Sequence, residues 1–279
     1  MNFLSFEKKL IPLDEWVQDF VNWLVLNYRD IFQAIKTPIE LCLEGFEWFF
    51  TFLHPVVIIV LFAYAAWRFV GKKTTVFTIV TFLLIGYLGL WEETMITLAM
   101  VISSVFFCAI VGIPLGIMSG RSDRFELFLR PALDAMQTIP PFVYLVPVVM
   151  LFSIGTVSGI LATIVFALPP IVRLTSLGIR QVHPELIEAA LAFGATPWQV
   201  LRKVQFPLAL PSIMAGLNQT LMMALSMVVI AALIGAGGLG NPVVQGLNTL
   251  EIGLATIGGL AIVLLAMMLD RITQGFANK

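Results

Sequence analysis

Residues 135–172 read AMQTIPPFVYLVPVVMLFSIGTVSGILATIVFALPPIV, and no charged side chain occurs between Asp134 and Arg173. A transmembrane helix needs about 20 mainly apolar residues, so this stretch can hold one or two spans. A second charge-free stretch lies between Lys203 and Glu251. Overall, 59% of the residues are hydrophobic and 12% are charged, whereas a soluble domain has about 25% charged residues. With a mean hydropathy of +0.97, the sequence predicts an all-α integral membrane protein.

Apolar runs separated by helix breakers predict about seven transmembrane helices. The expected spans are residues 54–70, 74–90, 94–119, 135–154, 157–177, 212–235 and 253–269. The first two are short for a membrane span, and we treat them as accessory helices within residues 54–93. Residues 94–279 form the expected core.

The lysine and arginine residues predict the orientation, because cytoplasmic loops carry an excess of them. Alternate loops contain Arg68, Lys72, Lys73, Arg121, Arg124, Arg130, Arg173, Arg180, Arg202, Lys203, Arg271 and Lys279. The intervening loops, near residues 91–93, 155–156 and 236–252, contain none. This places the C-terminus in the cytoplasm and, with seven spans, the N-terminus outside. Lys8, Lys9, Arg29 and Lys36 weaken the second inference, and an eighth span would reverse it.

Residues 1–53 form an N-terminal tail with two-faced helical character. Glu40, Glu44 and Glu47 recur at a spacing that puts three carboxylates on one helical face, among Leu, Phe and Trp residues. Such helices lie in the membrane interface. We therefore expect an external interfacial helix, and the alternative is an amphipathic helix packed on the outer loops.

The longest expected cytoplasmic loop, residues 173–211, carries signals for two short helices. Pro184 suits the first position of a helix, and Glu185 and Glu188 then complement the helix dipole from the first turn. Gly194 can adopt left-handed backbone angles and is expected to end this helix.

Thr196 and Gln199 have the spacing of a capping box, so a second helix is expected to begin there. We expect this helix to end near residues 206–207. Two capped helices joined at a glycine favour a rigid projection that docks on a partner, and the alternative is an ordinary interfacial connector.

The residues of this loop resemble a known family. Glu188-Ala189-Ala190, three residues, Gly194, nine residues and Val204-x-Phe206-Pro207 are similar to the EAA loop of ABC importer permeases, E-A-A-x3-G-x9-I-x-L-P. The chain departs from that pattern only by Val for Ile and Phe for Leu. The resemblance extends over about residues 94–273 and implies the five-helix core of the MetI-like type I importers. It also implies a coupling helix, near residues 184–207, that sits in a cleft of a separate ATPase. Its expected contact residues are Glu185, Glu188, Ala189, Ala190, Gly194, Ala195 and Pro207.

Four further stretches resemble the permeases of glycine betaine and proline betaine importers. They are D-x-x-Q-T-x-P-x-x-V-Y-L-x-P at 134–147, LSMVVIA at 225–231, GAGGLG at 235–240 and DRIT at 270–273. The resemblance implies a homodimer in the bacterial cytoplasmic (inner) membrane, two copies of a cytoplasmic ABC ATPase and a substrate-binding protein on a separate chain. ATP and Mg would bind the ATPase, and this chain would bind no cofactor. Choline, carnitine, proline and methionine are alternative substrates.

Rival chemistries find little support in the residues. The glycine cluster at 235–240 lacks the lysine of a phosphate-binding loop, so we expect no ATP hydrolysis by this chain. His54 and His183 are expected on opposite sides of the membrane, which argues against a catalytic or metal site. An ion-coupled carrier usually keeps ionisable residues within its spans, and the expected interiors have none. The net charge of −1 argues against nucleic acid as a partner.

The candidate pathway residues are polar side chains within expected spans: Gln137, Thr138, Tyr144, Asn218, Gln219 and Ser226. Prolines after Thr138 free backbone carbonyls, which membrane proteins tolerate where they line a cavity. Asn218 and Ser226 are eight residues apart, so we expect them roughly on one face. The alternative is that these residues lock the bundle by hydrogen bonds between helices, and Tyr144 would then be a core residue.

Overall fold

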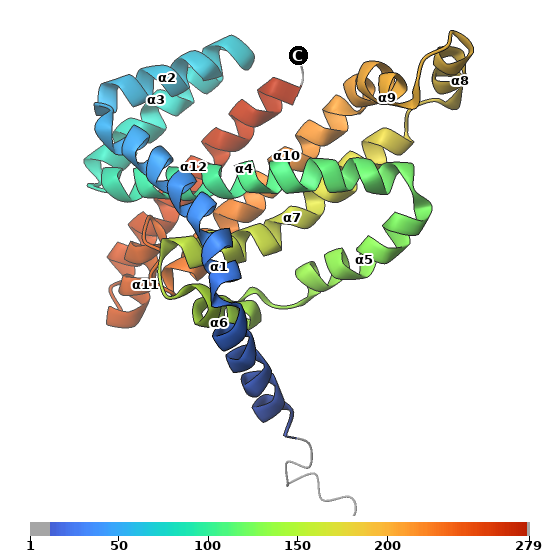
Figure 1. Cartoon of the computed structure of the whole chain (residues 1–279). Helices are drawn as coiled ribbons and strands as arrows, with labels where there is room; N and C mark the ends of the chain where they lie inside the picture. The colour runs from blue at the N-terminus through green and yellow to red at the C-terminus, as the bar shows by residue number, and fades with distance from the viewer. Residues whose placement is uncertain (1–11, 278–279) are drawn as a thin grey trace, which may run out of the picture.

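A computed structural model describes residues 12–277 of the chain, and this part consists of helices and short connections with no strand (Figure 1). The first eleven residues of the expected tail, with Lys8 and Lys9, and the terminal Lys279 lie outside the described residues. The helices are α1 Leu13–Phe52, α2 Pro55–Phe69, α3 Lys72–Tyr87, α4 Trp91–Arg121, α5 Asp123–Thr138, α6 Pro141–Phe152, α7 Thr156–Arg180, α8 Pro184–Ala192, α9 Pro197–Val200, the π-helical turn η1 Leu201–Gln205, α10 Phe206–Ala232, α11 Gly240–Thr249 and α12 Ile252–Ala277.

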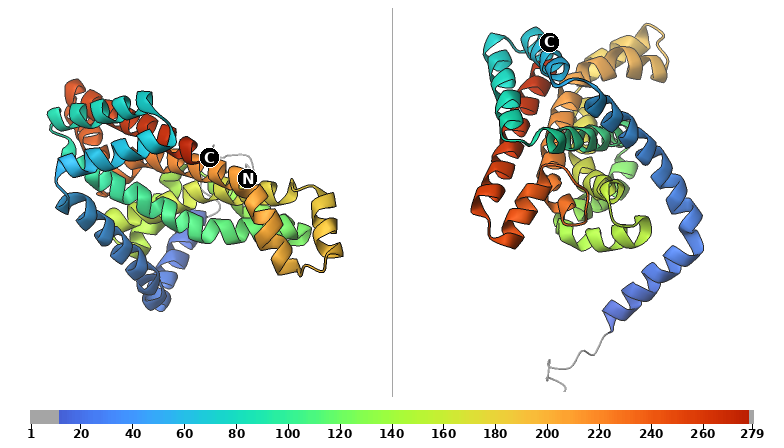
Figure 2. Two further views of the ribbon diagram at one scale, coloured as in Figure 1. Left: turned by 90° about the horizontal axis from the view of Figure 1, so that it is seen from above. Right: turned by 90° about the vertical axis from the view of Figure 1, so that its left-hand side faces the viewer.

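The centre of the molecule is formed by α4, α7 and α10, with α12 packed against α10 (Figure 2). Glycines on α4 let its backbone approach α7 closely, as small residues do between transmembrane helices. A Cβ atom added at Gly116 would lie 2.5 Å from the Cβ of Thr175 and 2.7 Å from the carbonyl oxygen of Val172. A Cβ atom at Gly112 would lie 2.5 Å from the Ile171 side chain. These two helices therefore form a rigid scaffold.

Four helices are long and apolar enough to cross a membrane alone: α4, α7, α12 and a continuous helix over Pro197–Ala232. Two bent pairs raise the number to six if each pair is one span: α1 with α2, bent by 106°, and α5 with α6, bent by 100°. Helices α2 and α3 occupy the positions of the two expected accessory spans, but they have 15 and 16 residues. They pack on each other and on α12.

The expected span over residues 135–154 is not one continuous helix. The helix stops at Thr138, Ile139 is extended with ψ 125°, and α6 begins at Pro141. A residue that precedes proline is pushed out of the helical region, and the consecutive Pro140 and Pro141 donate no backbone hydrogen bonds. The result is a pair of helices, α5 and α6, bent by 100° and called the broken span below.

The expected tail is largely one helix, α1, with a kink at Tyr28. Beyond the kink, Ile39, Leu43 and Phe50 are buried in the main core, and α1 packs against α4 and α6. Before the kink the helix projects from the bundle (Figure 2), with Trp16 and Phe20 exposed. The tail thus has two parts, and the second belongs to the folded core.

Candidate functional site

Residues 184–205, called the projecting segment below, extend from one end of the bundle (Figure 1). Helix α8 has no buried residue and packs on α9 and η1. Large apolar side chains are exposed on the segment, with Phe193 93% and Trp198 65% accessible. Leu186 and Leu191 are also exposed. An exposed apolar surface of this kind is typical of a docking site.

The turn between α8 and α9 has the predicted left-handed glycine and capping box. Gly194 has φ +82°, and a Cβ atom there would meet nothing within 4 Å. Its glycine is therefore required by the backbone angle rather than by crowding. The capping box is confirmed: the Thr196 N–H donates to Gln199 Oε1 at 2.8 Å, and the Gln199 N–H donates to Thr196 Oγ1 at 3.3 Å. These contacts fix the angle between the two helices.

The expectation that the second helix ends near residues 206–207 is wrong. The chain stays helical over Pro197–Ala232 through the π turn η1, where the Phe206 N–H donates to the Leu201 carbonyl. Proline in a regular helix lacks a donor and clashes with the carbonyl four residues before it. A wider π turn immediately before Pro207 relieves that conflict. The projecting segment is therefore continuous with α10.

The expected coupling residues form an open surface. Glu185, Glu188 and Ala189 are exposed, and neither carboxylate has an ion pair within residues 12–277. Ala190 and Ala195 are half-buried, and the Ala195 N–H donates to the Ala190 carbonyl at 3.0 Å. Pro207 is exposed at the start of α10.

The first set of expected pathway residues lies around the broken span. Gln137 Oε1 accepts a 2.9 Å hydrogen bond from Arg173, and Gln137 Nε2 lies 4.0 Å from Met223 Sδ on α10. Thr138 is exposed. The Tyr144 hydroxyl is buried without a hydrogen-bond partner within the described chain, and its ring packs in a small apolar cluster with Met227.

The second set of expected pathway residues, on α10, does not share one face of that helix. Asn218 Nδ2 donates to Asp270 Oδ1 at 2.8 Å, and Thr273 Oγ1 donates to Asn218 Oδ1. Ser226 is exposed and donates only to its own helix, at the Met222 carbonyl. Eight residues at 3.6 per turn leave the two positions about 80° apart, so the expectation of a shared face is wrong. Asn218 instead links α10 to α12, whereas Gln219 is exposed like Ser226.

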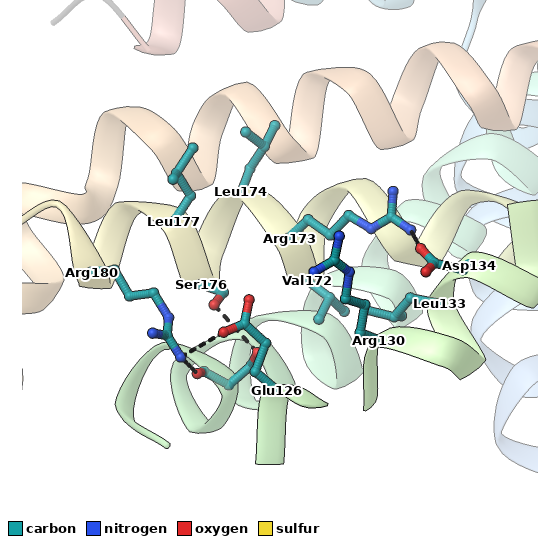
Figure 3. A pocket seen from close by; sticks show the side chains of 11 residues that line it. Glu126, Arg130, Leu133, Asp134, Val172, Arg173, Leu174, Ser176, Leu177 and Arg180 are labelled. Atoms are coloured by element: carbon teal, nitrogen blue, oxygen red, sulfur yellow. Dashed lines mark hydrogen bonds and ion pairs between the residues drawn. The ribbon is translucent and has the colours of Figure 1, made fainter. Parts of the chain in front are cut away.

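Two arginines on α7 hold α5, and sequence reasoning missed this role (Figure 3). Arg173 Nη2 lies 2.5 Å from Asp134 Oδ1. Arg180 pairs with Asp123 at 2.6 Å and with Glu126 at 2.8 Å. We expected both arginines in a cytoplasmic loop, where they served only to predict the orientation, but they lie within α7. Residues seven positions apart lie on the same face of a helix, so the spacing of Arg173 and Arg180 could have indicated a shared role.

A cavity of about 420 Å³ remains between α4, α5 and α7, and both arginines line it (Figure 3). Arg130 lines it as well and makes no ion pair within residues 12–277. No three His, Cys, Asp or Glu side chains gather as a metal site in the described residues.

Residues 112–279 match the model of a protein family described as "binding-protein-dependent transport system inner membrane component". The chain belongs to this family. The permease is 53% identical over 269 residues to the glycine betaine/proline betaine transport system permease protein ProW of Escherichia coli strain K12, covering 96% of this chain and 76% of that protein. It is 43% identical to the glycine betaine transport system permease protein OpuAB of Bacillus subtilis strain 168, covering 96% and 95%.

Solved structures agree with the expected MetI-like fold. The permease matches a chain of the MetNI methionine ABC transporter in an inward-facing conformation with a TM-score of 0.58 and 29% identity, covering 68% of this chain and 93% of that chain. A second crystal form gives a TM-score of 0.55 at 30% identity. The permease is thus an inner-membrane component of an ABC transporter, a family that works with an ATPase and a substrate-binding protein.

Proposed function

We propose that the permease carries glycine betaine, proline betaine or a closely related osmoprotectant into the cell. The similarity to ProW and OpuAB over 96% of the chain is the observation that supports this substrate class. The alternatives are other small zwitterions or amino acids: choline, carnitine, proline and methionine. Carnitine gains support from a relative, the glycine betaine/carnitine transport permease protein GbuB of Listeria monocytogenes, which is 44% identical.

The projecting segment is the docking site of the ATPase in this proposal, and its end of the bundle is cytoplasmic. Its exposed apolar side chains, such as Phe193 and Trp198, enter a cleft of the ATPase. Glu185, Glu188, Ala189, Ala190 and Ala195 form the surrounding contact surface. Closure of the ATPase on bound ATP and Mg pushes this segment. Because Pro197–Ala232 is one helix, the push reaches α10 and changes the side from which the pathway is open.

The assembly in this proposal is a homodimer with two ATPases and one external binding protein, and this chain itself binds no cofactor. The N-terminus lies outside, and α1 before its kink lies in the membrane interface. Gln219 and Ser226 are exposed on α10 and face the pathway between the two copies. Gln137, Thr138 and Tyr144 line its other wall.

Substitutions in the projecting segment test the coupling. Gly194→Leu forces a bulky side chain into left-handed angles, at a cost of about 1–2 kcal/mol, and Glu188→Lys reverses an exposed charge. Both should reduce co-purification of the ATPase and uptake of radiolabelled betaine by the reconstituted complex. Glu251→Lys, an equal charge change beside α12, should affect neither. Full ATPase binding and wild-type uptake in both projecting-segment variants would contradict the assignment.

Uptake of radiolabelled betaine, choline, carnitine, proline and methionine by the complete complex tests the substrate. Betaine uptake should exceed the others and require both the ATPase and the binding protein. Uptake by the permease alone in vesicles with an ion gradient would instead establish a secondary carrier.

A further inference from the structure

Helix α5 packs on the rest of the molecule through three apolar side chains, Leu129, Leu133 and Met136. Leu133 is its only buried residue, while Leu127 and Phe128 are 70% and 80% exposed. Both of its ends are breaks in the helical chain: Ser122 and Ile139 are extended. A helix bounded by two breaks and lightly packed can move as a unit.

The neighbouring α4–α7 pair has the opposite character. Gly112, Gly116 and Gly120 bring the two backbones into close contact, and an added Cβ atom at any of them would lie 2.8 Å or less from α7. Cores packed this tightly resist sliding. A separate set of contacts therefore fixes the position of α5 relative to the α4–α7 pair.

That set consists of two arginine clamps from α7, one at each end of α5 (Figure 3). Arg180 pairs with Asp123 and Glu126 in the first turn of α5 and also donates to the Ser119 carbonyl on α4 at 2.7 Å. Arg173 pairs with Asp134 and donates to Gln137 in the last turn of α5. A guanidinium has several donors in a fixed plane and can hold two acceptors at once. The cavity between the clamps shows that apolar packing does not fill this interface.

The Arg180 clamp lies next to the projecting segment. Arg180 is the last residue of α7, and α8 begins at Pro184. A groove between the end of α4 and the projecting segment is lined by Gly120, Arg121, Ile187, Leu191, Pro197, Val200 and Gln205. A push on the projecting segment therefore reaches the end of α7 and the α4–α5 break directly.

We propose that Arg173 and Arg180 are positioning residues that make α5 follow α7, so that movement of the projecting segment carries this half of the broken span with it. The inference rests on the proposed function of that segment. Apolar contacts alone would leave α5 free to lag behind, and ATP would then be hydrolysed without the matching movement of the pathway. Because exposed ion pairs contribute little to folding stability, their removal should leave the permease folded.

The test compares Arg173→Ala, Asp134→Ala and the charge exchange Arg173→Asp with Asp134→Arg in the complete complex, reconstituted in liposomes. The readout is betaine uptake per ATP hydrolysed, with ATPase co-purification as the check of assembly. Each single variant should keep the ATPase bound and lose about 5-fold or more in uptake per ATP, the lower end of ordinary coupling energies. The exchange should restore most of this ratio.

Two controls separate the clamps from the general charge of the cavity. Arg130→Ala removes a cation from the same cavity without breaking an ion pair, and its ratio should stay near wild type. Arg180→Lys keeps the charge but cannot hold Asp123, Glu126 and the Ser119 carbonyl together, so its ratio should fall.

Wild-type ratios in the single variants would overturn the inference, as would an equal loss in Arg130→Ala. An exchange variant that assembles but couples no better than the singles would overturn it too. Failure of the proposed function is a different result, because Gly194→Leu and Glu188→Lys would then both keep full ATPase binding and wild-type uptake, or the wild-type complex would not take up betaine.

Discussion

At Gly116 the absence of a side chain determines how closely α4 approaches α7. An added methyl group would lie 2.5 Å from the Thr175 Cβ and 2.7 Å from a backbone oxygen, and neither can move without shifting a helix. Gly116→Ala should therefore destabilise the permease by about 1–3 kcal/mol, as overpacking does. The measurement is the Tm in detergent. Gly259→Ala in α12 is the control, because nothing lies within 4 Å of its Cβ position, and its Tm should not fall.

Asn218 links α10 to α12 through Asp270 and Thr273. Asn218→Leu leaves these partners short of a hydrogen bond and should cost about 0.6–2 kcal/mol, the range measured between transmembrane helices. Ser226→Ala removes a bond within one helix and should leave the Tm unchanged. If Asn218→Leu kept the wild-type Tm but abolished uptake, Asn218 would instead belong to the pathway.

Among the elements, the break between α5 and α6 shows that consecutive prolines in a sequence do not by themselves predict where a helix is interrupted. Pro169 and Pro170 also stand together, yet α7 continues through both. Both of these prolines are buried in a helix that packs on α4 and α10, so packing holds the helix together, whereas Pro140 is exposed. The same Pro-Pro dipeptide thus interrupts the helix at one position and not at the other. The difference lies in whether the prolines are buried, which the sequence alone does not reveal.

Replacing Pro140 and Pro141 by Ala should let the helix continue from α5 into α6. Restored backbone donors remove the reason for the 100° bend, so uptake should fall while the ATPase stays bound. The measurement is betaine uptake and ATPase co-purification. Pro131→Ala lies within α5, where the helix already continues, and should leave uptake near wild type. Full uptake by the double variant would show that the bend is not needed.

Local signals in the projecting segment were predictable, and long-range pairings were not. The Thr196 capping box and the left-handed Gly194 follow from neighbouring residues alone, and both are confirmed. The contact of Arg173 with Asp134 joins residues 39 positions apart, which depends on how α5 folds back on α7. The π turn before Pro207 likewise depends on α10 continuing as a span.

For the whole molecule, composition and charge-free stretches were enough to predict a membrane bundle, and the EAA-like residues indicated its family. The division of the first 53 residues was not visible. Their Glu spacing describes an amphipathic helix, but an apolar face can contact lipid or protein equally well. Ile39, Leu43 and Phe50 pack in the main core, whereas of Leu13–Asn27 only Val21 is buried.

Two truncations separate these parts. Deletion of residues 1–27 removes the projecting part of α1 and keeps the Phe32–Phe152 ring contact at 5.5 Å, so the Tm should change by a few degrees at most. Deletion of residues 1–53 also removes the three buried side chains beyond the kink, which fit between helices, and van der Waals packing is what associates helices in lipid. Its Tm should fall by about 10 °C or more, since each kcal/mol is worth about 2–4 °C in a chain of this size. An equal loss from the shorter deletion would show that the projecting part of α1 also has a packing partner in the folded protein, such as a second copy of the chain.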